Sequence, residues 1–310
     1  MTGASPATAM LTDGLRASVR VPASTANLGP GFDCLGLALG IYDEVAVTVR
    51  GTGVSVDVRG EAAADVPRDE RHLVARAVAR GLDFAGVSAP GLHLDCVNAI
   101  PHSRGLGSSA AAVVGGLAAA SALLLAAGGE ALTDAELVQL AGEFEGHPDN
   151  AAASVLGGGV VTWTDTDGRY FGRRLPLHPD LVATAFVPQV ESSTSVTRGL
   201  LPDVVPRADA VFNLSRAALG VVALTVDPGC LMAATEDRLH QPYRAEAMAP
   251  TADLVEQLRR HGHAATVSGA GPSVVVLGTA PLTAAEAELA AVHGFEMREI
   301  PIADGVSFGG

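Results

Sequence analysis

The chain of 310 residues contains no lysine, so arginine supplies all 20 of its Lys and Arg side chains. A phosphate loop of the Walker A type needs a lysine after its last glycine, and Schiff-base catalysis needs a lysine amine. The sequence therefore excludes both. The formal net charge of −14 argues against nucleic acid as a partner, because nucleic-acid binding requires a basic face.

Cysteine is scarce as well: Cys34, Cys96 and Cys230 are odd in number and far apart. This spacing excludes a disulfide framework and a C-x-x-C metal knuckle, and it predicts a reduced, cytoplasmic environment. Residues 1–14 have neither a basic start nor an apolar stretch of useful length, so we expect no secretory signal. With 17% charged and 48% hydrophobic residues, the composition is typical of a compact globular protein.

One long segment carries no charge. Residues 110–127 number 18, which is the lower limit for a helix that crosses a membrane. The segment is mostly alanine, is interrupted by Gly115, Gly116 and Ser121, and follows a polar loop. These features favour a helix buried in a protein core, because small residues allow close packing against a sheet. We therefore expect no membrane partner.

A glycine loop precedes this helix. An apolar run over residues 91–97 predicts a strand, and the string Pro101-His-Ser-Arg-Gly-Leu-Gly-Ser-Ser-Ala-Ala-Ala112 follows it. Glycines let the backbone approach a ligand closely, and the start of a helix offers unpaired N–H groups, so the pattern predicts a phosphate site. Gly105, Gly107 and Ala110 also fit the dinucleotide pattern G-x-G-x-x-A. That pattern should follow its strand at once and lead to a second strand, whereas seven residues intervene here and a helix follows.

The spacing of apolar residues predicts a mixed succession of helices and strands. Valines alternate with other residues on both sides of Gly51-Thr-Gly53, which predicts a β-hairpin. Thr133-Asp-Ala-Glu136 is a capping box and predicts a helix over residues 133–145. Further helices are expected over 70–84, 209–225, 229–239, 252–261 and 283–292, and strands over 159–164, 181–187, 263–268, 273–277 and 295–300. The succession predicts an α+β sandwich with its domain boundary at 165–168.

Three strings carry a resemblance to a known family. Val21-Pro-Ala-Ser-Thr-Ala-Asn-Leu-Gly-Pro-Gly-Phe-Asp33, the glycine loop and Ser268-Gly-Ala-Gly-Pro-Ser273 resemble, in this order, the three motifs of the GHMP kinases, which phosphorylate small molecules. The resemblance implies an α+β, two-domain GHMP kinase fold. Its N-terminal, ribosomal-protein-like α/β domain would span residues 15–164 and bind ATP, and its C-terminal, ferredoxin-like α+β domain would span 165–310.

The resemblance also implies how ATP and Mg²⁺ are bound. The expected ATP-binding residues are Pro101, His102, Ser103, Arg104, Gly105, Leu106, Gly107, Ser108, Ser109, Ala110 and Ala111. Ser109 and Glu143 match the metal ligands of the family, with Ser108 as the alternative serine. Taken alone, Glu143 would be interpreted as a solvated helix residue. Arg104 either touches phosphate or pairs with a surface acid, and the sequence leaves both open.

Three further strings resemble the branch of the family that phosphorylates homoserine. They are Glu145-Gly-His-Pro-Asp-Asn150, Glu191-Ser-Ser-Thr-Ser-Val-Thr-Arg198 and Asp237-Arg-Leu-His-Gln-Pro-Tyr-Arg244. The substrate-binding residues implied by them and by the first motif are Asn27, Asp33, His147, Asp149, Asn150, Thr194, Arg198 and Arg244. Asp33 would face the substrate ammonium, and the two arginines would bind its carboxylate, since a guanidinium binds carboxylate in a bidentate manner. Asn150, Arg198 and Arg244 are the expected catalytic residues. An amide cannot accept a proton, so Asn150 would act by orienting the hydroxyl.

The predicted function is thus ATP-dependent phosphorylation of the side-chain hydroxyl of L-homoserine, giving O-phospho-L-homoserine in threonine biosynthesis, by a cytoplasmic homodimer. One alternative is a family member that phosphorylates mevalonate or a sugar; such members usually have Asp at the position of Asn150. Another is a non-catalytic regulator that binds ATP or a metabolite, although Ser109 and Glu143 are both present. His72 stands where the family often has Asn near the adenine, so a purine contact there stays open.

Overall fold

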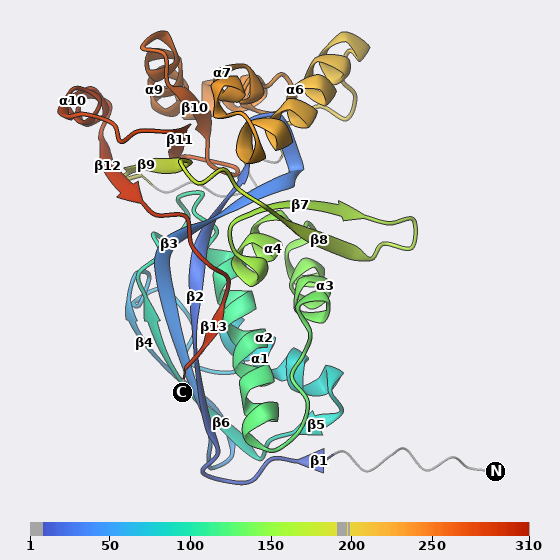
Figure 1. Ribbon diagram of the computed structural model, residues 1–310. Coiled ribbons are helices and arrows are strands. Elements are labelled where there is room, and N and C mark those ends of the chain that lie inside the picture. The colour runs from blue at the N-terminus through green and yellow to red at the C-terminus, as the bar shows by residue number, and fades with distance from the viewer. Residues whose placement is uncertain (1–8, 191–196, 198, 310) are drawn as a thin grey trace.

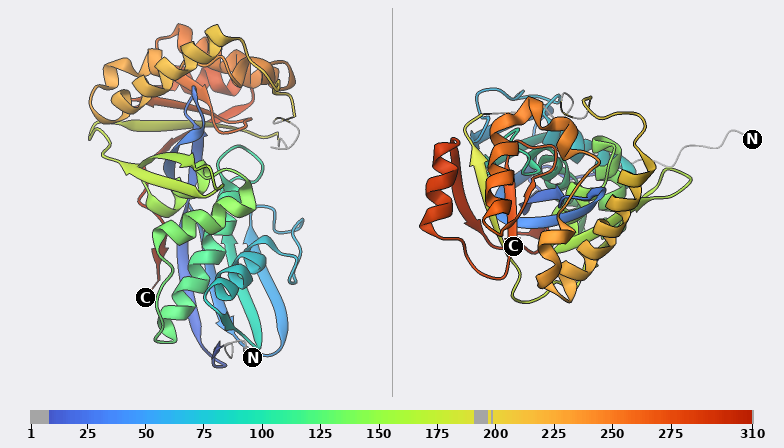
Figure 2. Two further views of the ribbon diagram at one scale, coloured as in Figure 1. Left: turned by 90° about the vertical axis from the view of Figure 1, so that its right-hand side faces the viewer. Right: turned by 90° about the horizontal axis from the view of Figure 1, so that it is seen from above.

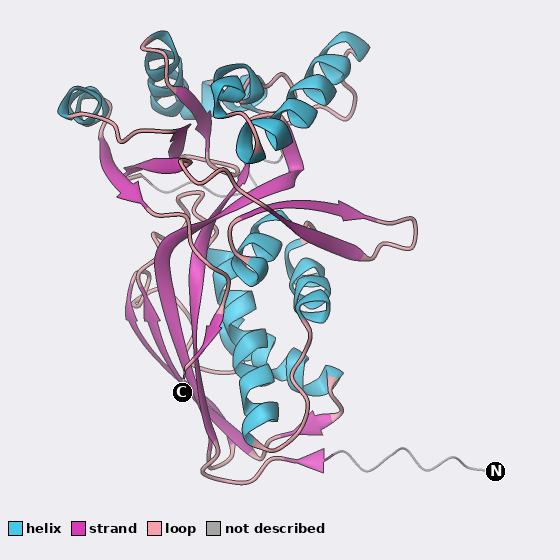
Figure 3. Ribbon diagram, in the orientation of Figure 1, coloured by secondary structure: helices cyan, strands magenta, loops and turns pink. Residues whose placement is uncertain are grey.

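Two sheets and the helices that cover them make up the molecule (Figure 1). The structure, a computed structural model, describes residues 9–190, 197 and 199–309. A 7-stranded sheet forms the lower part of the view, and a 4-stranded sheet with helices on its outer face forms the upper part. Figure 3 shows helices and strands in both halves of the molecule, and they follow one another along the chain in runs of one kind, which confirms the predicted α+β class.

The larger sheet has the strand order β13-β2-β3-β6-β4, and β7 and β8 extend it from β3. Its strands are β2 (Arg16–Asn27), β3 (Gly31–Val49), β4 (Gly53–Gly60), β6 (Gly91–Asn98), β7 (Gly159–Thr164), β8 (Tyr170–Leu175) and β13 (Ser307–Phe308). Helices α1 (Leu73–Phe84), α2 (Ser108–Ala126), α3 (Asp134–Glu145) and α4 (Asp149–Leu156) cover one side of this sheet. The short strands β1 (Ala9–Met10) and β5 (Val87–Ser88) pair with each other.

The smaller sheet has the order β10-β11-β9-β12. Its strands are β9 (Val182–Pro188), β10 (Ala264–Val267), β11 (Val274–Gly278) and β12 (Phe295–Ile300). The helices of this half are α6 (Arg207–Thr225), α7 (Leu231–Ala234), α8 (Gln241–Arg244), α9 (Ala249–Arg260) and α10 (Ala284–Val292), with 3₁₀ turns η1 (Pro228–Cys230) and η2 (Glu246–Met248). Helices α6, α7, α9 and α10 lie on the side away from the larger sheet (Figure 2).

The chain passes between the two halves more than once. The turn between β2 and β3 reaches the upper half, and the C-terminal strand β13 returns to pair with β2. The domain boundary predicted between residues 164 and 165 falls in the turn between β7 and β8, which pair with each other. That division of the chain remains a prediction.

The hairpin predicted at Gly51-Thr-Gly53 is wrong, although both of its strands form. β6 lies between them, antiparallel to β3 and parallel to β4. Alternation of apolar residues fixes which face of a strand is buried but not its neighbour. β6 is buried on both faces over most of its length, whereas β4 alternates between buried and exposed residues in its middle.

The helix predicted over residues 229–239 is wrong in its second half. After η1 and α7 the chain leaves the helical path at Ala234. The carboxylate of Asp237 accepts hydrogen bonds from the amides of Leu239, His240 and Gln241 at 2.7–3.1 Å. These amides would otherwise bond to carbonyl groups four residues earlier in a continuing helix. The side chain of Asp237 therefore stabilises the turn between α7 and α8 that stands where the second half of the predicted helix was expected.

Helix α2 is the buried helix expected from its alanine-rich sequence. A Cβ atom added at Gly116 would lie 2.5 Å from the carbonyl oxygen of Val74, so α1 and α2 pack with their backbones close together. Within the described chain, α2 and α6 are each long and apolar enough to cross a membrane by length and composition, and 78% of the α2 window is buried inside the protein. The burial of α2 explains its apolar sequence by core packing.

Asp43 fixes the point at which β6 gives way to the glycine loop. Its Oδ1 accepts hydrogen bonds from the amides of Ala99 and Ile100 at 2.7 and 2.9 Å. Burial raises the pKa of the Asp43 carboxyl to about 6, and the charge of Glu61 adds to this, although both amides oppose it. Two amides thus hold the ionised carboxylate in place, but burial removes water from it and so disfavours the charged form.

We expect Asp43→Asn to stabilise the protein at high pH. Between pH 3.8 and about 6 the folded carboxyl binds more protons than the unfolded one, so this group lowers the stability as pH rises through that range. Asparagine keeps an oxygen for both amides and has no charge to bury. The free energy of unfolding at pH 8 should rise by an amount on the order of 2 kcal/mol, and the difference should vanish near pH 4. Urea unfolding of both proteins from pH 4 to 8 measures this; parallel pH profiles would contradict it.

Candidate active site

The glycine loop packs against neighbouring backbone with no room for side chains. Gly107 is the N-cap of α2 and has a left-handed backbone with φ 70°. A Cβ atom at Gly107 would lie 2.2 Å from Ser24 Oγ, and one at Gly105 would lie 2.5 Å from the carbonyl oxygen of Ser268. Glycine is therefore required at both positions by contact as well as by φ. The loop presents the N-terminus of α2 to the adjoining cleft.

The three strings that the sequence singled out meet around this loop. Ser268 Oγ donates to the carbonyl oxygen of Gly105 at 2.6 Å and lies 2.9 Å from Thr25 Oγ1. Asn27 Nδ2 donates to the carbonyl oxygen of Gly269 at 2.8 Å, and Asn27 Oδ1 accepts the amide of Asp33 at 3.0 Å. The side chain of Asn27 thus joins the first string to the third and orients the turn that carries Asp33.

A cleft of about 490 Å³ lies where these segments meet. The sequence-predicted residues that line it are Asn27, Asp33, His102, Ser103, Gly105, Gly107, Ser108, Ser109, Ala110, His147, Asp149, Asn150 and Arg244. Pro101, Arg104, Leu106, Ala111 and Glu143 are not among its lining residues. Thr194 and Arg198 lie outside the described residues.

Arg104 connects the glycine loop to the end of β9. Its guanidinium donates to the backbone carbonyls of His102, Pro188 and Gln189 at 2.9–3.0 Å. Nη1 also lies 3.9 Å from the carboxylate of Glu61. Of the two roles left open by the sequence, this arrangement fits the pairing with an acid and adds an anchor for the loop.

Glu145, and not Glu143, lies beside the serine at the start of α2. Ser109 Oγ donates to Glu145 Oε1 at 2.7 Å, and both residues line the cleft. The carboxylate of Glu143 accepts hydrogen bonds from Arg80 at 3.0 Å and from Gln139 at 3.1 Å. The two acids are two positions apart on α3, so a helix sends them in different directions. Sequence analysis missed Glu145, whose signal was its place at the end of α3.

The other end of the cleft is rich in acidic groups. His147 Nδ1 lies 2.7 Å from Asp149 Oδ1, and that oxygen also accepts the amide of Asn150 at 2.7 Å. Ligand atoms of Asp33, His147 and Asp149 all lie within 4.8 Å of one another. Asp149 is buried. A group of two carboxylates and an imidazole at this spacing fits a cationic ligand group.

Asn150 is held by a residue that the sequence did not single out. Ser24 Oγ donates to Asn150 Oδ1 at 3.0 Å. This bond fixes the amide beside Gly107, where a Cβ atom would lie 3.1 Å from Asn150 Oδ1. Ser24 stands within the first string, so its position in that string was the available signal. Asn150 therefore lies between the glycine loop and the acidic end of the cleft.

Arg244 is a buried arginine at the wall of the cleft, with 1% of its surface exposed. Nε donates to the carbonyl oxygen of Thr197 at 3.1 Å, and the guanidinium lies 5.6 Å from the centre of the Phe32 ring. Burying a guanidinium costs free energy unless the group is hydrogen-bonded or paired with a charge. Its burial at this wall therefore indicates that its surroundings are built to hold it. Arg244 and the group of Asp33, His147 and Asp149 line the same cleft.

His72 lies apart from these residues. It is buried at the N-cap of α1 and is not among the lining residues of the cleft. Its Nδ1 has no hydrogen-bond partner among the described atoms, and burial lowers the pKa of the ring, as does the charge of Arg68. The possible purine contact of His72 stays open.

Comparison with known proteins gives matches to both halves of the chain. The family model for the N-terminal domain of GHMP kinases matches residues 72–158, and that for their C-terminal domain matches residues 226–295. The chain is 57% identical over 306 residues to the homoserine kinase of Rhodococcus erythropolis, covering 96% of this chain and 98% of that protein. It is 56% identical over 306 residues to the homoserine kinase of Mycolicibacterium smegmatis, covering 96% of each.

A solved structure agrees with these matches. The homoserine kinase of Cytophaga hutchinsonii superposes with a TM-score of 0.84 at 26% sequence identity, covering 96% of this chain and 98% of that chain. The fold predicted from the resemblance, with an N-terminal and a C-terminal GHMP kinase domain, is confirmed. On the motifs, the fold and these matches, the chain belongs to the GHMP kinase family.

Proposed function

We propose that the protein transfers the γ-phosphoryl group of ATP to the side-chain hydroxyl of L-homoserine, giving O-phospho-L-homoserine, a step in threonine biosynthesis. The observation that carries the proposal is that one cleft is lined both by the guanidinium of Arg244 and by the carboxylates of Asp33 and Asp149. An amino acid offers a carboxylate for the first and an ammonium for the second. Relatives that are more than half identical over nearly the full chain carry the name homoserine kinase.

The glycine loop and the start of α2 would bind the triphosphate. Gly107 leaves the first turn of α2 without a side-chain cap, so its amides face the cleft together with the positive end of the helix dipole. No lysine exists in the chain to bind the phosphates. Backbone amides therefore have a larger share in holding the nucleotide than in a loop of the Walker A type.

Ser109 and Glu145 fit the needs of a Mg²⁺ ion better than Ser109 and Glu143. Mg²⁺ takes a small number of protein oxygens together with phosphate oxygens and water. Ser109 Oγ and Glu145 Oε1 are already in contact at the edge of the nucleotide end of the cleft. The ion, when bound, neutralises charge on the phosphates. In this proposal the role expected for Glu143 passes to Glu145, and Glu143 supports α3 through Arg80.

Asn150 would orient the acceptor hydroxyl. Its oxygen is taken by Ser24, and an amide does not remove a proton, so we assign it no role as a base. Correct alignment of two reactants can lower an activation barrier by roughly 7–11 kcal/mol. A general base usually raises the rate by roughly 10²–10⁴-fold, which corresponds to a barrier lowered by only about 3–5 kcal/mol. Arg244 would act with it by fixing the carboxylate end of the acceptor. Thr194 and Arg198, outside the described residues, remain proposed partners in this task.

We also propose that the enzyme is a cytoplasmic homodimer. Helix α6 carries exposed apolar side chains at Val211, Leu214 and Val222, and an exposed Val226 follows at its C-cap. These side chains follow the spacing of one helix face, and a contiguous apolar face on a soluble protein commonly marks an interface. Three free thiols are consistent with a reducing compartment.

The acceptor can be identified by a direct assay. We expect purified protein to release ADP with ATP, Mg²⁺ and L-homoserine, and to do so far more slowly with mevalonate or galactose, which have no ammonium to match Asp33 and Asp149. Phosphohomoserine should accumulate in step with ADP. Turnover of mevalonate but not of homoserine would replace this proposal by the mevalonate alternative. ATP binding without turnover of any acceptor would favour the regulator.

The metal assignment can be tested with a matched pair of variants. Glu145→Gln should lower kcat and raise the Mg²⁺ concentration needed for half-maximal rate, by roughly 10- to 100-fold in metal affinity or activity. Glu143→Gln is the control: it lies on the same helix and changes partly exposed contacts with Arg80 and Gln139, so its Mg²⁺ titration should match the wild type. The reverse result would restore Glu143 as the metal ligand.

Replacing Arg244 should weaken acceptor binding selectively. In Arg244→Leu the substrate carboxylate loses a charged hydrogen bond worth about 1.5–3 kcal/mol, which corresponds to roughly a 10- to 150-fold rise in KM for homoserine. KM for ATP should change little, since the glycine loop does not involve this residue. Arg244→Lys should recover only part of the loss, because an ammonium lacks the planar fork. If only KM for ATP rises, Arg244 belongs to the nucleotide end of the cleft.

A further inference from the structure

His240 is fully buried, with 0% of its surface exposed, and both of its ring nitrogens have partners. Nδ1 lies 3.0 Å from Nη1 of Arg244, and Nε2 lies 2.8 Å from the carbonyl oxygen of Gly29. The ring also packs against Phe32, with the ring centres 5.4 Å apart. The imidazole therefore lies between the arginine from α8 and the turn between β2 and β3.

These two partners fix the protonation of the ring. A guanidinium only donates, so Nδ1 must accept, and a carbonyl only accepts, so Nε2 must carry the proton. A protonated imidazole would direct an N–H at the guanidinium and lose this bond. Burial lowers the pKa of His240 below its usual value; the charge of Arg244 adds to this, while Asp237, the carbonyl of Gly29 and Asp33 oppose it. The ring is thus held neutral in a single tautomer.

The turn that His240 contacts carries the acidic side of the acceptor site. Gly29 lies between Asn27 and Asp33, and a Cβ atom at Gly29 would lie 2.5 Å from the carbonyl oxygen of Thr235. The turn is therefore pressed against the segment that leads to His240. Through the imidazole, the backbone beside Asp33 is connected to the guanidinium of Arg244 by two hydrogen bonds in series.

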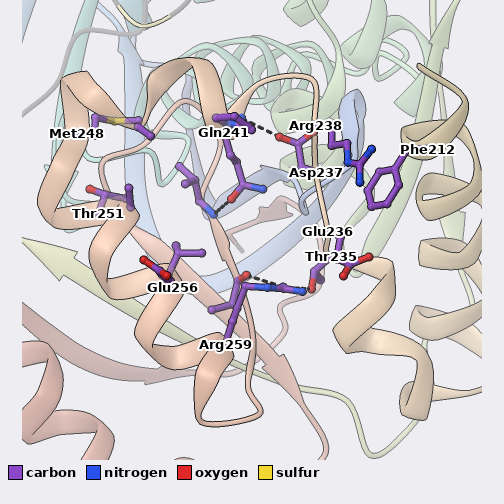
Figure 4. A pocket seen from close by; sticks show the side chains of 16 residues that line it. Phe212, Thr235, Glu236, Asp237, Arg238, Gln241, Met248, Thr251, Glu256 and Arg259 are labelled. Carbon is purple, nitrogen blue, oxygen red and sulfur yellow. Dashed lines mark hydrogen bonds between the residues drawn. The ribbon is translucent and has the colours of Figure 1, made fainter. Parts of the chain in front are cut away.

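His240 is held in place from its other side. Asp237 accepts the amide of His240 at 3.1 Å and the side-chain amide of Asn213 at 2.8 Å. Figure 4 shows Asp237, Arg238 and Gln241 in the lining of a second pocket. This pocket has a volume of about 620 Å³ and shares no lining residue with the cleft. The segment thus has a pocket side, with Asp237 and Arg238, and a cleft side, with Arg244.

We propose that His240 is a positioning residue for the acceptor: its neutral imidazole orients the Arg244 guanidinium and ties it to the turn that carries Asp33. The distance between the carboxylate-binding and ammonium-binding sides of the site is then fixed before the substrate arrives. Pre-ordering of this kind improves binding because fewer side-chain conformations are lost on association. The inference rests on the proposed function only for the identity of the acceptor.

Two substitutions separate hydrogen bonding from packing. His240→Phe keeps a ring against Phe32 but has no nitrogen, so KM for homoserine should rise by roughly 10-fold or more, as for a lost hydrogen bond to a charged group. KM for ATP should stay near the wild-type value. His240→Gln offers an acceptor for Arg244 and a donor for Gly29, and should recover part of the loss. Equal KM values for homoserine in the wild type and His240→Phe would overturn the proposal.

Combination with Arg244→Leu tests whether His240 acts through the arginine. If it does, His240→Phe should raise KM for homoserine little further once Arg244 is gone. Additive effects would show that His240 acts on the fold in general and would overturn the proposal. Arg238→Gln is the matched control: it lies two residues away, on the pocket side, and its side chain contacts Asp209 and Phe212. All kinetic constants should match the wild type in this control.

The tautomer can be observed without any substrate. In protein with ¹⁵N-labelled histidine, the signals that disappear in His240→Gln belong to His240. They should show a proton on Nε2 and a bare Nδ1, unchanged between about pH 6 and 8. A ring protonated on Nδ1 would overturn the inference even if homoserine is the substrate. Wild-type protein inactive on homoserine, with the Nε2–H tautomer intact, would instead overturn the proposed function alone.

Discussion

The close approach of three backbone segments at the glycine loop is the constraint on which the site depends. The loop touches β2 at Ser24 and the turn after β10 at Ser268, with contacts that leave no space for a Cβ atom at Gly105 or Gly107. Because the contacts are between backbones, α2 begins at a point set by both halves of the molecule. Asn27 adds hydrogen bonds in two directions from the same place. The two ends of the cleft are thus positioned by a single junction.

Charge in the cleft is arranged by burial. Asp149 and Arg244 are almost fully covered, and such groups are tolerated only when they are hydrogen-bonded. Each is hydrogen-bonded: Asp149 accepts from Asn150 and lies beside His147, and Arg244 donates to Thr197 and His240. Little reorganisation is then needed when a zwitterion enters. The fold carries the cost of desolvating these groups before the substrate binds, which favours recognition of an acceptor with two opposite charges.

Much of the fold and part of the site could be predicted from the sequence. Local patterns held: the capping box at Thr133 and Glu136 is formed, and α2 begins at Ser108. Predictions that depend on distant partners did not hold. The alternation of β4 could not reveal that β6 separates it from β3, and the apolar spacing after Gly229 could not reveal that the helix ends at Ala234 and that Asp237 stabilises a turn after it. In the structure Glu145 contacts Ser109 whereas Glu143 contacts Arg80, and the resemblance alone did not distinguish the directions of these two side chains.

Because the chain has no lysine, no ammonium side chain can neutralise the phosphates of ATP. Among the described residues that line the cleft, the charged side chains are Asp33, Glu145, Asp149 and Arg244, with His102 and His147 as titratable groups. Arg244, Asp33 and Asp149 belong to the proposed acceptor end, and Glu145 contacts Ser109 at the start of α2, so the proposed nucleotide end offers amide dipoles and a carboxylate in place of an ammonium. Dipoles stabilise an anion less than a full charge does, and a carboxylate repels it. Bare ATP would meet this repulsion directly, whereas ATP already carrying Mg²⁺ turns the same carboxylate into an attraction. On the proposed assignment of the site, the electrostatics of the cleft would therefore favour the magnesium complex of ATP over the free anion.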